Sequence, residues 1–428
     1  MKNFSRRDWL KRVAASAAAI SAGELLLLDS IHAKNSGNVV IIGGGYGGAT
    51  CARYIKMYAP NINVTLIEPD TKFISCPFSN LVVAGLKKID FITHDYSNLT
   101  NKYSINLIHD WVTKINKSKN TISLKKGKSI KYDFLVVSPG VDFRWDKISG
   151  YSEENSKIIP HAWNAGEQTL LLHNQIKAMN DGGSVLISIP QKPYRAPPAP
   201  YERASLIANY LSKHKPKSKI IILDPNGQSE NLALFKHAWN KYYSGMIDIV
   251  DGKDALITKV DVKTKTLINQ SGAKHNGDVI NLIPPQYAAS IARSSGLSNK
   301  SGWCDIDPKT FKSTRAKNIY VIGDSSNAGD MPKLAHAANS QAKVCAVAIV
   351  SRINGNSISD PVLNTSIYSF VSSRSAISEV GVYRVKNATI KRVSGGISDK
   401  NASKKHRLKE SKYAYGWYKG INRDMLGS

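Results

Sequence analysis

Three glycines, Gly43, Gly45 and Gly48, lie where an apolar run gives way to a helix-like stretch. Residues 39–42 have the composition of a buried strand and residues 49–58 that of a helix, so the glycines fall in the turn between them. In such a turn the first glycine permits the bend, the second lets a pyrophosphate approach the backbone, and the third lets helix and strand pack closely. The free N–H groups and dipole of the new helix attract phosphates. The spacing therefore predicts a dinucleotide site.

An acidic residue supports this prediction. Glu68 stands twenty residues beyond Gly48, directly after a second predicted strand, residues 63–67. A carboxylate at that place accepts hydrogen bonds from ribose hydroxyls and repels the 2′-phosphate of NADP. The strand, turn, helix and acid together favour a nucleotide site over a simple glycine-rich loop.

Two later segments bring further side chains toward this site. Residues 72–80 form a loop with one cysteine, Cys76, near where a dinucleotide would extend from its ribose end. Residues 318–324 read as a buried strand that ends in Gly323 and Asp324. In two-domain flavoproteins a carboxylate at this place meets the ribityl chain of FAD, so the sequence predicts FAD as the dinucleotide.

A second strand and turn lack the glycines of the first. Residues 184–189 predict the opening strand of a second doubly wound unit, but residues 190–203 that follow are rich in proline. Proline has no N–H to offer a phosphate, and its ring occupies the approach path. The second unit is therefore expected to keep the fold and to lack an NAD site.

These segments predict an α/β fold with two Rossmann-like dinucleotide-binding domains, the FAD domain discontinuous and the NAD-like domain degenerate, plus a C-terminal interface domain. The expected divisions are a signal peptide (1–33), the first part of the FAD domain (34–150), the second domain (151–280), the rest of the FAD domain (281–352) and the C-terminal region (353–428). The aromatic residues of that last region are expected to form either core or contact surface.

The chain is strongly basic, with a net charge of +27 over 428 residues. Such a charge favours acidic partners, but no compact basic stripe with interleaved aromatics and no nucleic-acid motif is present. An acidic protein or an anionic substrate is therefore expected, with a generally lysine-rich proteome as the alternative. No cysteine pair has metal-ligand spacing, so no metal site is predicted.

The first residues have the pattern of an export signal. Arg6 and Arg7 precede an apolar run, residues 13–28, and a plausible cleavage point after Ala33. This resembles a twin-arginine signal, which exports proteins already folded around a cofactor. The mature protein is expected in the periplasm, with no other stretch that could span a bilayer.

Taken together, the motifs resemble those of the flavoprotein subunit of flavocytochrome c sulfide dehydrogenase, a relative of the sulfide:quinone reductases and glutathione-reductase-like flavoproteins. The strings that carry the resemblance are the glycine turn, the Cys76 loop, Pro-Tyr-Arg-x-Pro-Pro-x-Pro-Tyr-Glu-Arg at 193–203, Ile-Pro-Pro-Gln at 283–286, Gly-Trp-Cys at 302–304 and Met-Pro-Lys at 331–333. The resemblance implies periplasmic oxidation of sulfide, with electrons passing through covalently bound FAD to a haem-bearing cytochrome c subunit, expected to be dihaem.

The resemblance also implies roles for single residues. Cys76 would form a thioether to the flavin, and Lys333, near the start of a predicted helix, would face the flavin pyrimidine. Glu202 would carry a proton near the flavin, the alternative being an ion pair with Arg203 or Arg195. Two histidines beside these segments, at positions 161 and 336, have no partner spacing that predicts more than packing or hydrogen bonding.

The sequence departs from the family at the redox disulfide. The family's two cysteines fall at Ala196 and near Ser366, and no cysteine follows Cys345. Neither alanine nor serine can replace a disulfide as electrophile and electron relay. Three hypotheses therefore stay open: weak sulfide oxidation, oxidation of another reduced sulfur species, and a non-catalytic flavoprotein that binds the cytochrome.

Overall fold

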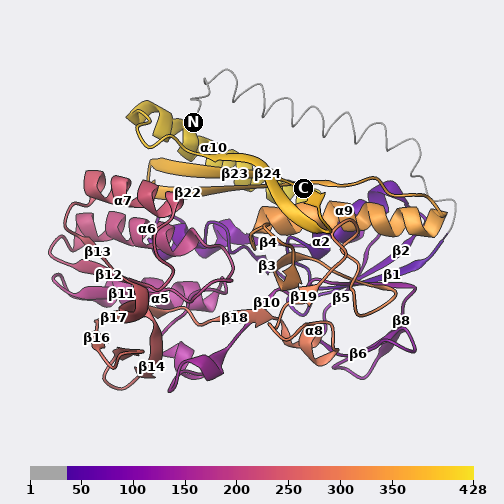
Figure 1. Cartoon of the computed structure of the whole chain (residues 1–428), viewed down its shortest axis with the longest axis horizontal. Helices are drawn as coiled ribbons and strands as arrows, with labels where there is room; N and C mark the ends of the chain where they lie inside the picture. The colour runs from indigo at the N-terminus through magenta and orange to yellow at the C-terminus, as the bar shows by residue number, and fades with distance from the viewer. Residues whose placement is uncertain (1–35) are drawn as a thin grey trace.

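The structure is a computed structural model that describes residues 36–428. The predicted signal peptide, residues 1–33, lies outside the described residues. Figure 1 shows two halves, each built on a parallel sheet, with a sheet from the C-terminal region lying above them. The α/β fold predicted from the sequence is confirmed.

The first half contains a five-stranded parallel sheet. Its strands in spatial order are β20 (Ile319–Val321), β9 (Phe134–Val137), β1 (Asn38–Ile42), β2 (Asn63–Ile67) and β5 (Asn106–Ile108). The central strands are apolar along their length because both faces of a parallel sheet are covered. Helices α2 (Gly48–Tyr58) and α9 (Ala335–Asn354) pack against each other and share one core with the sheet. Because β20 joins β9, the first domain is completed from far downstream, as predicted.

Two glycines make the turn between β1 and α2 possible. Gly43 has a φ of +96°, and a Cβ there would lie 2.3 Å from the carbonyl oxygen of Ser138. A Cβ on Gly48 would lie 1.9 Å from the carbonyl oxygen of Gly43. A larger residue at Gly43 would collide with the backbone that follows β9, and one at Gly48 would push the helix away from the end of β1.

The second half contains a four-stranded parallel sheet. Its strands in spatial order are β13 (Ile247–Asp251), β12 (Lys219–Asp224), β11 (Ser184–Ser188) and β17 (Val279–Leu282), and its helices are α5 (Glu167–Ala178), α6 (Ala199–His214) and α7 (Glu230–Tyr242). Strand β17 crosses the division expected at residue 280, because all four of its residues are buried in this sheet.

Shorter elements connect these two units. They are β3 (Phe73–Ile74), α3 (Ser79–Val83), β4 (Thr93–His94), α4 (Ser97–Asn101), β6 (Val112–Asn116), β7 (Thr121–Leu124), β8 (Ser129–Lys131), β10 (Val141–Phe143), β14 (Ile257–Asp261), β15 (Thr266–Asn269), β16 (Lys274–Asn276), β18 (Gln286–Ala288), α8 (Ser290–Ser294), β19 (Cys304–Asp305) and β21 (Ser326–Asn327). Strands β10 and β18 pair where the chain leaves and re-enters the first half.

The C-terminal region forms an antiparallel sheet and a long helix. The sheet consists of β22 (Val362–Ser372), β23 (Ser375–Lys386) and β24 (Thr389–Ile397), and α10 (Lys404–Leu426) packs on β23. Strand β22 contacts both α9 of the first half and α6 of the second, so this sheet bridges the two halves (Figure 1). Within the described residues, no helix is both long and apolar enough to cross a bilayer.

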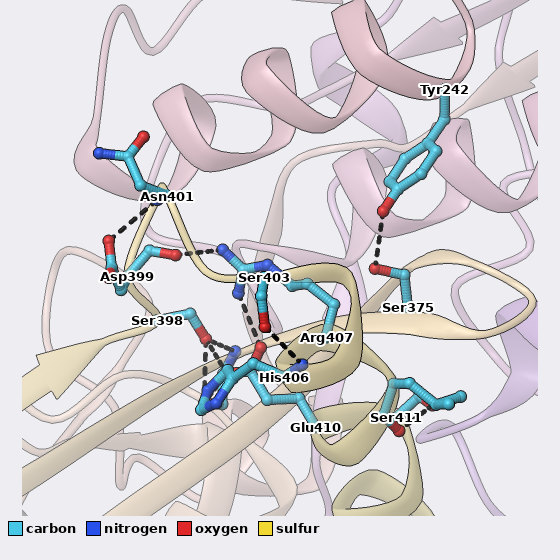
Figure 2. A network of polar contacts seen from close by, with 12 residues as sticks. Tyr242, Ser375, Ser398, Asp399, Asn401, Ser403, His406, Arg407, Glu410 and Ser411 are labelled. Atoms are coloured by element: carbon cyan, nitrogen blue, oxygen red, sulfur yellow. Dashed lines mark hydrogen bonds and ion pairs between the residues drawn. The ribbon is translucent and has the colours of Figure 1, made fainter. Parts of the chain in front are cut away.

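A buried polar network holds the start of α10 on this sheet (Figure 2). Glu410 accepts hydrogen bonds from Arg407 Nη1, at 2.7 Å, and from Ser398 Oγ. Ser403 caps the helix by accepting from the His406 N–H at 3.2 Å. Since the Arg407 and Glu410 charges are both buried, each compensates the other, and removal of either would leave an unpaired buried charge.

Candidate functional site

A large cavity lies where the two halves meet the C-terminal sheet. Its empty volume is about 1340 Å³, part of it open to solvent. The residues predicted from the sequence that line it are Gly43, Gly45, Glu68, Cys76, Ala196, Glu202, Gly323, Asp324 and Ser366. Two predicted residues, Gly48 and Lys333, do not line it.

The glycine turn forms one end of the cavity. A Cβ on Gly45 would meet no atom within 4 Å, so the backbone there is open to a ligand. Glu68 accepts hydrogen bonds from the N–H of Gly44 at 2.6 Å and of Asp70 at 3.1 Å. Burial raises the pKa of Glu68, and these two hydrogen bonds oppose the rise. A carboxylate keeps further acceptor positions, so Glu68 can also receive ribose hydroxyls.

Asp324 is the clearest sign that a polar ligand belongs in the cavity. The residue is half-buried, but its Oδ1 is inaccessible to solvent and has no hydrogen-bond partner among the described residues. Burial raises its pKa, while the charges of Arg195 and Lys333 oppose that rise. Buried polar atoms in native proteins are normally hydrogen-bonded. A hydroxylated chain running past Asp324, such as the ribityl chain of FAD, would supply the missing donor, so the cavity fits this cofactor.

Lys333, expected to face the flavin pyrimidine, lies outside the lining of the large cavity. Its Nζ donates hydrogen bonds to the carbonyls of Asp324 and Ser326, both at 2.8 Å, and lies 3.7 Å from the ring centroid of Trp303. Burial lowers the pKa of this ammonium to about 8. Its side chain lines a smaller neighbouring pocket and braces the loop that carries Asp324.

Cys76 occupies a tight loop before α3. The next residue but one, Phe78, has a left-handed backbone with φ of +70°, and the Ser79 N–H donates to the Cys76 carbonyl at 3.1 Å. The thiol lies 3.8 Å from the carbonyl oxygen of Trp163. It is the one cysteine among the described residues that lines the cavity, which fits attachment to a ligand there.

Glu202 lies in the cavity wall and is half-buried. It accepts hydrogen bonds from Asn80 Nδ2 and from the Phe370 N–H, both at 2.8 Å. Burial raises its pKa to about 7, against the effect of these two hydrogen bonds and of the Arg203 charge. A carboxyl with this pKa can both give and take a proton near neutral pH.

The alternative ion pair of Glu202 is not found. Of the ion pairs between described residues, none joins Glu202 to Arg195 or Arg203. Arg203 instead donates to Asn80 Oδ1 at 2.9 Å and to Asn281 Oδ1 at 2.7 Å. Asn80 therefore links the arginine to the carboxylate, a contact between distant segments that no sequence spacing indicated.

Ala196 and Ser366, where the resemblance implies the missing disulfide, both line the cavity. Ala196 has a left-handed backbone with φ of +52°, and its N–H donates to the Lys333 carbonyl at 2.8 Å. Ser366, on β22, contacts His336 at the start of α9. Sequence reasoning assigned His336 no partner, because Ser366 lies thirty residues away.

The proline loop of the second unit leads straight into α6. Pro198 precedes the first residue of the helix and Pro200 is its second, so neither position has an N–H. The Ala199 N–H donates to the Ala196 carbonyl at 2.9 Å. The start of α6 therefore has few donors for a phosphate.

The other cysteines are packed away from the cavity. Cys51, Cys304 and Cys345 are all 0% exposed. Cys345 lies beside Cys51 in the core of the first half, whereas Cys304 belongs to another cluster. Cys304 and Cys345 are thus no substitute for the family's redox pair. Across residues 36–428, no group of His, Cys, Asp or Glu side chains could hold a metal ion.

Three protein-family models match the chain. The model for pyridine nucleotide-disulphide oxidoreductases matches residues 37–171. The central part of the sulfide dehydrogenase (flavocytochrome c) flavoprotein chain matches residues 169–284, and the flavin-binding part of flavocytochrome c sulphide dehydrogenase matches residues 359–426. The flavin-binding match supports FAD as the cofactor.

Individual proteins agree with these matches. A 44-residue segment is 57% identical to the sulfide dehydrogenase (flavocytochrome c) flavoprotein chain of Chlorobaculum thiosulfatiphilum, covering 10% of this chain and 92% of that one. The mitochondrial sulfide:quinone oxidoreductase of Dictyostelium discoideum is 27% identical over 326 residues, 73% of this chain and 70% of the relative. The crystal structure of the sulfide:quinone oxidoreductase of Aquifex aeolicus has the same fold, with a TM-score of 0.73 at 19% identity over 92% of this chain and 93% of that one.

Proposed function

Because this chain belongs to the flavocytochrome c sulfide dehydrogenase flavoprotein family, we propose that it is a periplasmic FAD-dependent oxidoreductase that oxidises sulfide or a closely related reduced sulfur species. Its electrons pass to a c-type, dihaem cytochrome subunit. The observation that carries the proposal is the cavity itself, in which the nucleotide turn, unpartnered Asp324 and the protonatable carboxyl of Glu202 meet.

Bound FAD supplies a two-electron acceptor for the sulfur substrate and a one-electron donor for a haem. Asp324 and Glu68 would hold its hydroxyls, and the open backbone at Gly45 would receive its pyrophosphate. Glu202 takes the proton that hydrogen sulfide loses as it is oxidised, because its pKa lies close to neutral pH. Cys76, which lines the cavity, would be the residue that holds the flavin covalently as a thioether.

The missing disulfide favours a second candidate. Ala196 and Ser366 line the cavity where two cysteines would relay electrons, and Cys76 is already assigned to the flavin. The chain would then act on another sulfur substrate, or would be a weakly active flavoprotein partner of the cytochrome.

Rapid mixing of the anaerobic holoenzyme with hydrosulfide separates these candidates. The proposal predicts bleaching of the flavin absorbance, with a rate that rises with hydrosulfide concentration. If hydrosulfide fails and thiosulfate, sulfite or a small persulfide succeeds, the second sulfur substrate is correct. No bleaching by any of them would leave only the non-catalytic role.

The cytochrome subunit is expected to dock by charge. Helix α10 exposes basic side chains that take part in no ion pair among the described residues. These residues are Lys404, Lys405, Lys409, Lys412, Lys419 and Arg423. Tyr413 lies among them and is 57% exposed, so the surface has an aromatic contact as well as charge. Such a surface would steer an acidic partner at low ionic strength.

A matched pair of variants tests this surface. In Lys409→Glu/Lys412→Glu, association with an acidic dihaem cytochrome c should slow about tenfold or more at low salt and approach the wild-type rate at high salt. The control, Lys125→Glu/Lys128→Glu, changes the net charge equally on the turn between β7 and β8, which lies far from α10 in Figure 1. Equal slowing in both variants would attribute steering to net charge and would contradict the assignment to α10.

A further inference from the structure

His336 and Ser366 form a hydrogen-bonded pair in the cavity wall. His336 is the second residue of α9, and Ser366 lies in the middle of β22. Two atoms of Ser366 approach the same ring nitrogen: Oγ lies 2.7 Å from His336 Nδ1, and the backbone N lies 2.9 Å from it.

This geometry determines where the imidazole carries its proton. The backbone N–H of Ser366 can only donate, so Nδ1 must be an acceptor and cannot hold a proton. The hydroxyl then has to point its own proton at Nδ1 to make the 2.7 Å contact. Neutral His336 is therefore the tautomer protonated on Nε2, and Ser366 Oγ keeps its lone pairs free.

The other ring nitrogen of His336, Nε2, carries a proton but has no hydrogen-bond acceptor among the described residues. Among the described residues no hydrogen bond is made by Nε2, and His336 lines the cavity. Burial and the charge of Lys343 lower the pKa of His336 to about 4, while Asp424 opposes them. Protonation of Nδ1 would also break its contact with the backbone N–H of Ser366. The ring, which belongs to the cavity lining, thus stays neutral throughout the neutral pH range.

The pair lies where the resemblance places the missing redox disulfide. The resemblance puts one cysteine at Ala196 and the other near Ser366, and both residues line the cavity. The Ala196 N–H is bonded to the Lys333 carbonyl, three residues before His336, so all three residues lie at the same wall.

We propose that His336, oriented by Ser366, binds the sulfur substrate by donating its Nε2–H to a sulfur anion such as hydrosulfide. This inference rests on the proposed sulfur substrate and deepens it. A hydrogen bond would thus hold the anion where the family uses a covalent bond to cysteine. No electron passes through the pair, so it positions the substrate and does not replace the relay.

The first test measures the proton and the ligand without turnover. Histidine labelled with ¹⁵N in the holoenzyme should show His336 as the Nε2–H tautomer, identified by loss of its signals in His336→Gln. The flavin is then reduced photochemically. Sodium hydrosulfide is titrated into the reduced holoenzyme. A saturable shift of the His336 Nε2 and proton signals supports the proposal. The Nδ1–H tautomer, or signals that do not move, would overturn it.

The second test uses two amides that imitate opposite sides of the ring. Asn at position 336 can accept from Ser366 as Nδ1 does but offers no donor at Nε2, whereas Gln extends its amide N–H toward the Nε2 position. The expected KM for hydrosulfide rises about 10- to 100-fold in His336→Asn and much less in His336→Gln, with kcat changed less than KM. Equal KM values in variants with wild-type melting temperatures would refute the assignment.

The proposed function and the proposed role of His336 can be refuted separately. If wild-type flavin is not reduced by hydrosulfide, the proposed function is wrong, and the titration of the reduced holoenzyme still reports whether His336 binds the anion. If reduction is normal and His336→Asn leaves KM unchanged, the function stands and the role of His336 is wrong.

Discussion

Replacing Glu202 with Gln gives a measurable change in how stability depends on pH. The pKa of this buried carboxyl is raised from 4.5 to about 7. Since the folded-state pKa lies above the unfolded one, its contribution to stability is complete below pH 4.5 and is lost as the pH rises to about 7. At about 1.36 kcal/mol per pH unit, the wild type loses about 3 kcal/mol across this interval. Glutamine does not ionise, so the Glu202→Gln variant loses no stability at this position across the same pH interval.

The quantity to measure is the unfolding free energy of Glu202→Gln minus that of the wild type. Gln can accept from either Asn80 or Phe370 but not from both, which costs about 1 kcal/mol at every pH. The difference should therefore rise by about 3 kcal/mol from pH 4.5 to just above pH 7 and then level off. Equilibrium urea unfolding of the holoenzymes at several pH values in this range gives the curve.

An exposed carboxylate supplies the control. Glu153→Gln should give a flat difference, because Glu153 lies at the surface. A flat curve for Glu202→Gln as well would mean that its carboxyl ionises as it does in water, and its proposed proton transfer near neutral pH would be wrong. If the curve rises as predicted, flavin reduction by hydrosulfide should also fall about 100-fold or more in Glu202→Gln.

Three further predictions concern the cofactor and the substrate. Cys76→Ala should release its flavin when denatured in acid, whereas the wild-type band should fluoresce on a denaturing gel; a wild-type band without fluorescence would exclude covalent attachment. Millimolar NADH should leave the anaerobic flavin absorbance unchanged, because prolines replace the phosphate-binding glycines of the second unit, and bleaching within seconds would disprove this. Ala196→Cys/Ser366→Cys should oxidise sulfide faster than the wild type and than either single variant, since it restores an electrophilic relay; no gain in the double variant would show that this chain does not need one.

The nucleotide end of the site could be predicted from the sequence because its requirements are local. The turn at Gly43 needs a positive φ, and the close approach at Gly48 excludes a Cβ. Both constraints require glycine, so both are visible in the sequence. A strand buried on both faces must be apolar throughout, which made β1 and β20 recognisable. Glu68 follows its strand directly, so its place needed no tertiary contact.

The ends of helices and strands were harder to predict where strand pairing in the folded protein, rather than the local sequence, sets them. Strand β17 continues to residue 282 because its partner β11 is long enough to pair with all four residues, and nothing in the sequence at 280 marks an end. The sequence also left open whether the aromatic residues of α10 belong to the core or to the surface. Tyr418 is buried at 4% exposure and Tyr413 is 57% exposed, a difference set by which face of the helix meets β23.

What the sequence by itself determined is the identity of the groups: a nucleotide turn, a cavity cysteine, an acid and the loss of two cysteines. The tertiary structure decided what those groups do. Glu202 has a pKa of about 7 because burial outweighs the hydrogen bonds from residues 80 and 370. Lys333 braces a loop because its ammonium reaches the carbonyls of residues 324 and 326, and His336 becomes a donor because Ser366 lies against its other nitrogen. Burial and hydrogen bonding depend on distances in space, and residues far apart in a chain acquire such distances only when it folds.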